Sequence, residues 1–578
     1  MSKMLYRIGR FAARRPWVVI GTWLIVSISV ITASSVFGRE LTDSFEVPGL
    51  DSTLAVEVLS DANADSAGLT AQVVVTPTDE QITFFDSVEA EQELARIQSG
   101  LAALPNVLGT SDPAGALALG AEQAASTGAI SADGRIALIR LQYPVVEELD
   151  PTDLERLQEF GAEAAVGSPL QIEMNGDLHW AFEEAETGAG EMIGIIAAVV
   201  ILLVAFGSLI AMGLPIGMAL FGLGLGVSSM SLITYLIDIP SWAPQIASMV
   251  GLGVGIDYAL FLVTRHREFL ARGLPVAESA GRAVATAGQA VIFAGGTVVI
   301  AILGLAFAGV PFMTAAGVAT SVVVAIMVVA SVTLLPAFLG LSGPWINRLG
   351  IHRRSSVAKN EVGAGWERWG RHVAGNAWAY TIGVTTLLLA LTAPVLALQL
   401  GFPDDGSQPE SQTKRRAYDL VAEGFGPGIN GPLVIAVDLA GEANADAAVV
   451  DALATAIAAD AGIASVAPPE VDAQAGVATI VAFPTTAPQD SATVDTIERL
   501  RAEVFPPLLD ETPTKAHVGG QTATFADIAE RVSDRLPLFV SAVIGLSFLL
   551  LMLVFRSLLV PLKAAILNLL SIGAAYGV

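Results

Sequence analysis

The stretch MVGLGVGIDYALFLVTRHREF, residues 249–269, places one carboxylate in the middle of an apolar segment that is long enough to form a membrane helix. Asp257 and its neighbour Tyr258 follow three alternating glycines, Gly251, Gly253 and Gly255. An ionisable group at membrane depth costs about 2.5–3.5 kcal/mol on insertion scales, so it usually serves a proton or ion relay, a substrate contact or an interhelix pair. We interpret Asp257 as one half of a proton relay.

Simpler interpretations of the same residues remain open. Asp257 could be a buried carboxylate that hydrogen-bonds to a neighbouring helix for packing alone, and Tyr258 could be an ordinary packed aromatic residue. The glycines superficially resemble a phosphate-binding loop, but they lie inside an apolar helix with no soluble strand before them. They therefore predict close packing against a neighbouring helix.

The composition of the whole chain indicates a polytopic membrane protein with sizeable soluble parts, because the 578 residues are 53% hydrophobic and only 15% charged. The formal charge of −26 comes mainly from two segments. Residues 38–190 hold 28 Asp and Glu against 5 Lys and Arg, and residues 400–535 hold 21 against 8. This acidity argues against nucleic acid as a partner. The chain has no cysteine, which excludes disulfides and thiolate metal sites.

The hydropathy pattern divides the chain into nine predicted spans and their connections. The first helix, with its basic N-terminus, occupies residues 1–37, five more spans fill 191–340, one lies at 378–399, and an eighth and an incomplete ninth lie at 536–578. Residues 341–377 form a predicted cytoplasmic or interfacial linker. The first apolar run is longer than a signal-peptide core and more spans follow it, so it predicts an uncleaved helix.

Basic residues set the predicted orientation. Arg and Lys are concentrated in the N-terminal segment, after the fourth span and after the sixth span. The positive-inside rule places all three segments in the cytoplasm. Residues 38–190 and 400–535 are then two extracytoplasmic domains of a multi-pass protein of the cell membrane.

Each acidic loop has the pattern of a folded α+β domain. In both loops the expected order is strand, helix, strand, strand, helix, strand, which is the split β-α-β arrangement of ferredoxin-like domains. The expected elements are 71–77, 84–104, 107–111, 135–143, 152–166 and 171–176 in the first loop, and 432–440, 444–460, 463–469, 477–484, 490–507 and 515–520 in the second.

An internal duplication relates the two halves of the chain. The pattern Arg-x-Gly-Arg-(x6)-Trp recurs at an offset of 361 residues, and Phe-x-Ser-Leu recurs at an offset of 349. The matched stretches are 7–17 with 368–378, and 206–209 with 555–558. At the second offset the counterpart of Asp257 falls near position 606, so we expect a second relay pair beyond Val578 and a chain truncated within the second helical repeat.

Motifs for ATP hydrolysis or enzymatic catalysis are missing from the sequence. It has no Gly-Lys dipeptide and hence no Walker A loop, and it has no Gly-x-Ser-x-Gly elbow or His-Glu-x-x-His motif. We therefore expect no enzyme activity, cofactor or metal, and we expect an ion gradient to power any work that the protein does.

The pattern Gly251-x-Gly253-x-Gly255-x-Asp257-Tyr258-x-x-Phe261, followed by an Arg-rich exit, resembles the fourth helix of the MMPL family. This family belongs to the resistance-nodulation-division superfamily, and the resemblance covers essentially the whole chain. It implies a duplicated α-helical bundle with two extracytoplasmic ferredoxin-like porter domains. In the family, Asp-Tyr pairs on the fourth and tenth helices face each other and relay protons; only the first pair carries over, to Asp257 and Tyr258.

The resemblance also implies a function. It predicts export of lipids or other hydrophobic molecules across or from the cytoplasmic membrane, driven by the proton-motive force and typical of actinobacterial envelopes. Membrane lipids, a hydrophobic substrate and protons are the expected partners. Two alternatives stay open: a non-transporting sensor or scaffold that binds lipid or protein, and a proton-driven accessory of protein secretion. The sequence indicates neither the oligomeric state nor the particular substrate.

Overall fold

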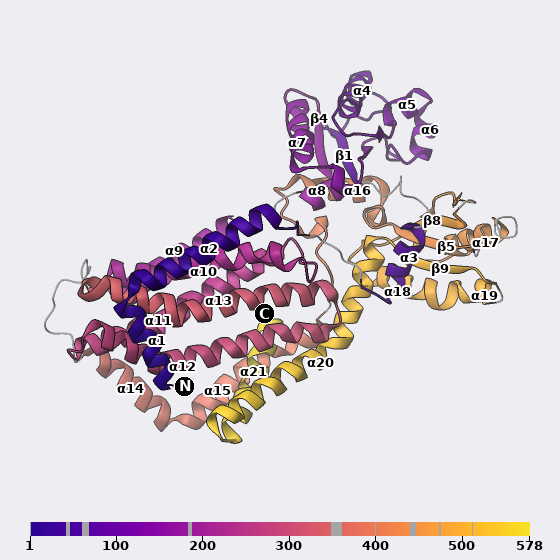
Figure 1. Ribbon diagram of the computed structural model, residues 1–578. Helices are drawn as coiled ribbons and strands as arrows, with labels where there is room; N and C mark the ends of the chain where they lie inside the picture. The colour runs from indigo at the N-terminus through magenta and orange to yellow at the C-terminus, as the bar shows by residue number, and fades with distance from the viewer. Residues whose placement is uncertain are drawn as a thin grey trace. The chain divides into compact units, whose positions relative to one another are not determined.

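The computed structural model describes residues 2–41, 47–60, 69–182, 188–347, 361–398, 400–439, 447–472, 475–510 and 512–578. Two compact units emerge from the chain (Figure 1). The helical unit comprises Met1–Phe45, Glu186–Gln399 and Arg531–Val578. The sheet unit comprises Glu46–Ala185 and Leu400–Glu530. Each half of the sequence therefore contributes to both units, as the internal duplication suggests.

Eight described helices are long and apolar enough to cross a membrane. Their shared feature is an 18-residue window of high hydropathy with few charges, which is the composition that a lipid environment selects. The predicted span at 191–207 corresponds to α9 (Gly188–Phe206), whose apolar stretch Met192–Phe206 is shorter. The eight are α2 (Pro16–Phe37), α10 (Leu209–Ile233), α11 (Ala243–Ala271), α12 (Val276–Leu303, extended by the 3-10 turn η3, Gly304–Ala308), α13 (Pro311–Ser342, extended by η4, Gly343–Asn347), α15 (Ala377–Thr392, extended by η5, Ala393–Ala397), α20 (Gln521–Phe555) and α21 (Leu559–Gly577).

Helix α13 is the centre of the helical unit. It packs against α2, α10, α11 and α12, and most of its buried side chains are small or β-branched. Small residues let helix backbones approach closely, which is the main source of packing energy between helices in lipid. Against this central helix, α10, α11 and α12 are held in fixed positions. A separate contact joins α15 to α21.

Two shorter helices belong to the same unit. Helix α1 (Ser2–Arg14) precedes the first span and packs against α12 and α13. Helix α14 (Glu361–Gly375) lies in the predicted linker and exposes Trp366 and Trp369. Residues 348–360 of that linker fall outside the described residues, and its placement at the membrane interface stays a prediction.

The first sheet has four antiparallel strands in the order β2-β3-β1-β4. Helices α4 and α7 follow β1 and β3 in the predicted order, and Ser87 caps α4 by accepting a hydrogen bond from the backbone N–H of Ala90. Two short helices between β2 and β3, α5 and α6, were not expected. The elements are β1 (Thr70–Pro77), α4 (Val88–Ala102), β2 (Gly109–Thr110), α5 (Pro113–Ala118), α6 (Ala121–Ser126), β3 (Ala137–Gln142), α7 (Pro151–Ala165), β4 (Leu170–Asn175) and α8 (Asp177–Phe182).

The second sheet repeats this order as β6-β8-β5-β9, with a fifth strand, β7, paired to β8. The helix predicted over 490–507 is instead α18 followed by a π-helical segment, Leu500–Val504, and the short α19. The elements are β5 (Leu433–Asp438), α17 (Ala447–Ala458), β6 (Ile463–Val466), β7 (Glu470–Asp472), β8 (Val477–Pro484), α18 (Ser491–Arg499), α19 (Pro506–Leu509) and β9 (Lys515–Gly519).

The two loops exchange one helix each. Helix α3 (Asp51–Ser60), from the first loop, packs on β5 and β9 of the second sheet. Helix α16 (Thr413–Phe425), from the second loop, packs on β1 and β4 of the first sheet. Neither α+β domain is therefore built from a single loop, although the sequence suggested two separate domains.

Candidate functional site

Asp257 lies near the middle of α11 on a face that the described residues leave open. Its side chain is exposed, and so are Gly253 and Phe261, four residues before and after it. Residues four apart share one face of a helix, so these three positions form a stripe along α11. Asp257 is the only acidic residue of α11 before Glu268, which lies near the end of the helix.

The opposite face of α11 is packed, and two of the glycines explain how. A Cβ atom at Gly251 would lie 2.8 Å from Cγ1 of Val323 on α13, which is closer than real Cβ contacts come. A Cβ at Gly255 would lie 3.0 Å from Sδ of Met327 and 3.1 Å from Cβ of Ala219 on α10. Any side chain at these positions would push α11 away from α10 and α13.

Gly253 differs from the other two glycines. A Cβ at this position would meet no atom of the described chain within 4 Å. It shares the open face with Asp257, so the helix packing predicted for it stays a prediction about a neighbour beyond the described residues.

Tyr258 points into the helical unit. Its side chain is only 6% exposed and belongs to the same apolar cluster as Val328 of α13. Its ring reaches α12 at Gly295, where an added Cβ would lie 3.3 Å from Cε2 of the ring. The sequence analysis did not single out Gly295, although a Gly-Gly pair at 295–296 in an apolar helix was a usable signal. Because Gly295 has no side chain, the Tyr258 ring packs closely against α12. This contact helps to fix the rotation of α11 about its axis and hence the direction in which the Asp257 side chain points.

The carboxylate of Asp257 has no hydrogen bond or ion pair with another described residue. The described residues also hold no group of His, Asp and Glu that could bind a metal ion. The chemistry open to this carboxylate is the gain and loss of a proton, or a polar contact with whatever covers the open face.

The basic residues that end α11 have structural contacts. Arg265 forms an ion pair with Glu268 at 2.6 Å. The guanidinium of Arg267 donates to the carbonyl oxygen of Phe206 at 2.9 Å and lies over its ring. His266 is fully buried. These contacts anchor the end of α11 and lie two turns or more from Asp257.

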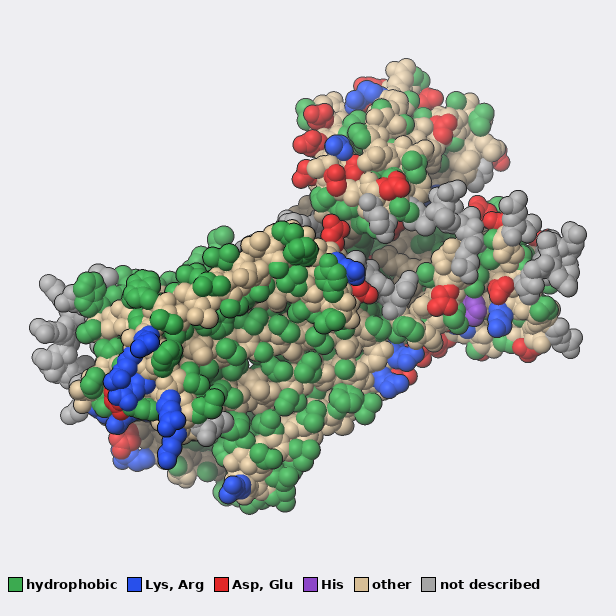
Figure 2. Space-filling model, viewed as in Figure 1, with side chains coloured by type: hydrophobic (Ala, Val, Ile, Leu, Met, Phe, Trp, Pro, Cys, Tyr) green, Lys and Arg blue, Asp and Glu red, His purple; other side chains and the backbone are tan. Residues whose placement is uncertain are grey.

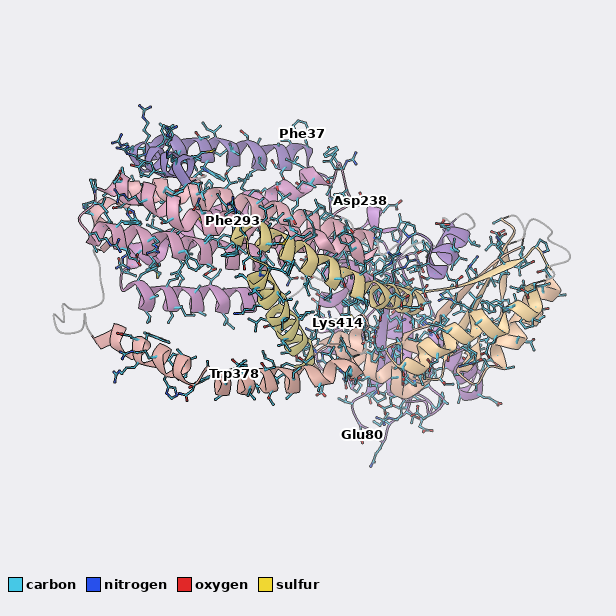
Figure 3. All side chains as sticks on the ribbon, turned by 90° about the horizontal axis from the view of Figure 1, so that it is seen from below. Phe37, Glu80, Asp238, Phe293, Trp378 and Lys414 are labelled. Carbon is cyan, nitrogen blue, oxygen red and sulfur yellow. The ribbon has the colours of Figure 1, made fainter. Side chains whose placement is uncertain are left out.

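Asp238 provides a second acidic residue for comparison. It is exposed, and it lies in the connection between α10 and α11 (Figure 3). Tyr235, just before it, donates a hydrogen bond to the carbonyl oxygen of Phe37 at 2.7 Å. Asp238 is exposed like Asp257 but lies outside the helix, so it is a control for the loss of a carboxylate at a different place.

Comparison with known proteins identifies the family of this chain. The MMPL family profile matches residues 45–379 and 408–578. Membrane protein YdfJ of Bacillus subtilis is 34% identical over 584 residues, which span 100% of this chain and 77% of that protein. The mycolic acid-containing lipids exporter MmpL11 of Mycolicibacterium smegmatis is 28% identical across 68% of this chain and 41% of its own length. The trehalose monomycolate exporter MmpL3 of Mycobacterium tuberculosis is 24% identical across 74% and 48%. The chain belongs to the MMPL family of membrane proteins.

Proposed function

We propose that this chain belongs to a transporter that moves lipids or other hydrophobic molecules, and that protons taken up and released by Asp257 drive the movement. The observation that carries the proposal is the exposed carboxylate in the middle of α11, without a partner among the described residues. Around it, the helix is held rigidly by glycine contacts to α10 and α13.

A single carboxylate in this position can act as a two-state element. When it is ionised, the open face of α11 carries a charge that is costly to bury in apolar surroundings. When it is protonated, the same face is nearly neutral and can pack against an apolar helix. One elementary charge that crosses a potential of 100 mV releases about 2.3 kcal/mol, which is enough to bias such an equilibrium strongly. We propose that the partner surface is a second Asp-Tyr pair on another helix of the protein.

Tyr258 has a positioning role in this proposal. Because its ring is buried against Gly295 of α12, it cannot turn to the open face together with Asp257. We assign to it the orientation of α11, and we assign the proton exchange itself to Asp257.

The substrate class rests on relatives. MmpL11 of Mycolicibacterium smegmatis and MmpL3 of Mycobacterium tuberculosis are named as exporters of mycolic acid-containing lipids and of trehalose monomycolate. They share less than half of their own length with this chain, so a lipid substrate is here a proposal. We place the sheet unit outside the cell, as porter domains, on the strength of its acidity and of the basic segments in the helical unit.

The test is lipid transport by the intact protein in vesicles with an imposed pH gradient. Asp257→Asn keeps the size of the side chain and removes the titratable proton, so we expect transport to fall at least a hundredfold. Asp238→Asn, which removes a carboxylate from the connection between α10 and α11, should leave the rate within about twofold of the parent.

Yield and thermal unfolding are the controls for this test. Equal yield and equal thermal unfolding of both variants would show that folding is intact. Transport by Asp257→Asn at the parental rate would overturn the proton relay. Lipid binding without transport, unchanged by Asp257→Asn or by an uncoupler, would instead support a non-transporting sensor or scaffold.

A further inference from the structure

Helix α1 has one face that is fixed to the helical unit. Gly9 and Ala13 on this face are buried. A Cβ at Gly9 would lie 2.7 Å from Cγ2 of Val284 on α12, and a Cβ at Gly281 would lie 3.1 Å from Cβ of Arg10. Glycines on both sides of the contact therefore bring α1 and α12 into close contact. Such a docked helix cannot rotate, so its other face points away from the unit permanently.

That outward face combines cations with large apolar side chains. Lys3, Arg7 and Arg14 are exposed on it, together with Met4 and Phe11, which are 67% and 50% exposed. Positions 3, 7, 11 and 14 follow the helical spacing of four, four and three residues, so they lie along one stripe. Figure 2 shows Lys and Arg side chains gathered over α1.

The acidic residue that contacts α1, Glu278, is already paired. Glu278 on α12 accepts a hydrogen bond from Tyr6 at 2.5 Å and forms ion pairs with Arg282 at 3.0 Å and Arg10 at 3.8 Å. Lys3, Arg7 and Arg14 have no ion pair with any described residue. The stripe thus presents at least three positive charges that the described part of the protein does not neutralise.

We propose that this stripe binds the headgroups of negatively charged phospholipids at the membrane surface. Directly after α1 comes α2, a candidate membrane span that begins at Pro16, so α1 lies at the depth where headgroups lie once α2 spans the bilayer. Cations that alternate with large apolar residues on one helix face suit this interface, because phosphates meet the cations while Phe11 and Met4 enter the acyl boundary. A soluble anion would use the cations alone and leave the apolar side chains in water.

Lipid binding by α1 is separate from transport and requires only that α2 spans the membrane. Each basic residue near an anionic leaflet strengthens binding by about fivefold. Removal of three should therefore weaken the affinity for anionic lipid by about a hundredfold.

The experiment measures lipid binding to the intact protein in detergent, with phosphatidylglycerol and phosphatidylcholine as the two probes. The test variant is Lys3→Gln/Arg7→Gln/Arg14→Gln. The control variant, Arg265→Gln/Arg272→Gln/Lys563→Gln, removes the same number of charges from α11, from the residue that follows it and from α21. Thermal unfolding of each variant without lipid checks that all remain folded.

We expect the parent and the control variant to prefer phosphatidylglycerol, and the α1 variant to lose that preference. Equal binding of both lipids by the parent would overturn the proposal. An equal loss in the two variants would also overturn it, because it would mean that lipid responds to total charge and not to α1.

Discussion

The exchanged helices α3 and α16 occupy equivalent places in the two sheets of the sheet unit, yet different chemistry holds them there. At the start of α3, the carboxylate of Asp51 accepts a hydrogen bond from the backbone N–H of Val518 on β9 at 2.8 Å. At the start of α16, the hydroxyl of Thr413 accepts one from the backbone N–H of Met174 on β4 at 2.9 Å. The geometry is repeated, but only one of the two contacts carries a charge.

Around α3 the charge is part of a partly buried network, in which the carboxylate of Asp527 is the most buried group. Arg501 forms ion pairs with Asp51 at 2.7 Å and with Asp527 of α20 at 2.6 Å, and its side chain is 22% exposed. His517 contacts the other oxygen of Asp51 at 2.6 Å. Burial alone raises the pKa of Asp51, but the hydrogen bond with His517 and the charge of Arg501 outweigh it and hold this pKa below its ordinary value of 3.8.

Around α16 a single pair replaces the network. Arg416 binds both oxygens of Glu173 on β4, at 2.7 and 2.9 Å; the glutamate side chain is 6% exposed, whereas the arginine side chain is 38% exposed. Solvent reaches Arg416 and screens this single pair, whereas Arg501 holds two carboxylates, so its removal leaves two charges uncompensated. We therefore expect α3 to depend on its charges much more than α16 does.

The largest effect should come from Arg501→Met, which removes the arginine that Asp51 and Asp527 share. We expect local opening of α3 from β9 to become easier by about 3 kcal/mol, or about a hundredfold faster hydrogen exchange of the Val518 amide. Arg499→Met is the control, because it breaks an ion pair with Asp460 that does not include Asp51 or Asp527. Equal hydrogen exchange of the Val518 amide in the two variants would contradict the dependence of α3 on Arg501.

An intermediate effect is expected from pH. Because the pKa of Asp51 is lower in the folded protein than in the unfolded chain, its stabilisation is complete well above pH 3.8 and is lost as the pH falls through the folded value. Protection of β9 should thus drop below about pH 4 in the parent. In Asp51→Asn the protection should be lower by about 2 kcal/mol at neutral pH and should change less with acid. Parallel pH curves for the two proteins would argue against this assignment.

The smallest effect should come from Glu173→Gln. The amide retains a hydrogen-bond acceptor, and Arg416 can turn towards solvent, so we expect a loss of about 1 kcal/mol in the opening of α16 from β4. Exchange of the Met174 amide measures it, with Thr413→Val as a neighbouring variant that removes the acceptor itself. A loss of protection as large as that in Arg501→Met would contradict the expectation that α3 depends on its charges more than α16 does.

The sequence predicted most elements of the sheet unit but not the exchange of helices. Short runs of apolar and β-branched residues predict the main strands, and Ser or Asp before a helix marks its start, as Ser87 and Asp490 do here. Which sheet an amphipathic helix covers is a long-range question, and Asp51 and Val518 are 467 residues apart. The helices α5 and α6 were missed because each has only six residues and too few large apolar side chains to show a period.

For the candidate site, the sequence could indicate the residue but not its surroundings. Asp257 is conspicuous because it interrupts an apolar run. Successive helical residues are 100° apart, so the sequence predicts that Gly253 lies on a different face from Gly251 and Gly255. The sequence does not indicate which face packs against α10 and α13, because that depends on where the neighbouring helices lie. The seat of Tyr258 at Gly295 likewise depends on the packing of α12 against α11.

The most direct test of the account follows protons and lipid at the same time. The intact protein is placed in vesicles that enclose a pH-sensitive dye, a lipid acceptor is added outside, and the internal pH and the lipid released are recorded together. We predict that lipid release by the parent is accompanied by proton movement in a fixed ratio, and that both vanish in Asp257→Asn. Lipid release without proton movement, or proton-coupled release that persists in Asp257→Asn, would contradict the central claim.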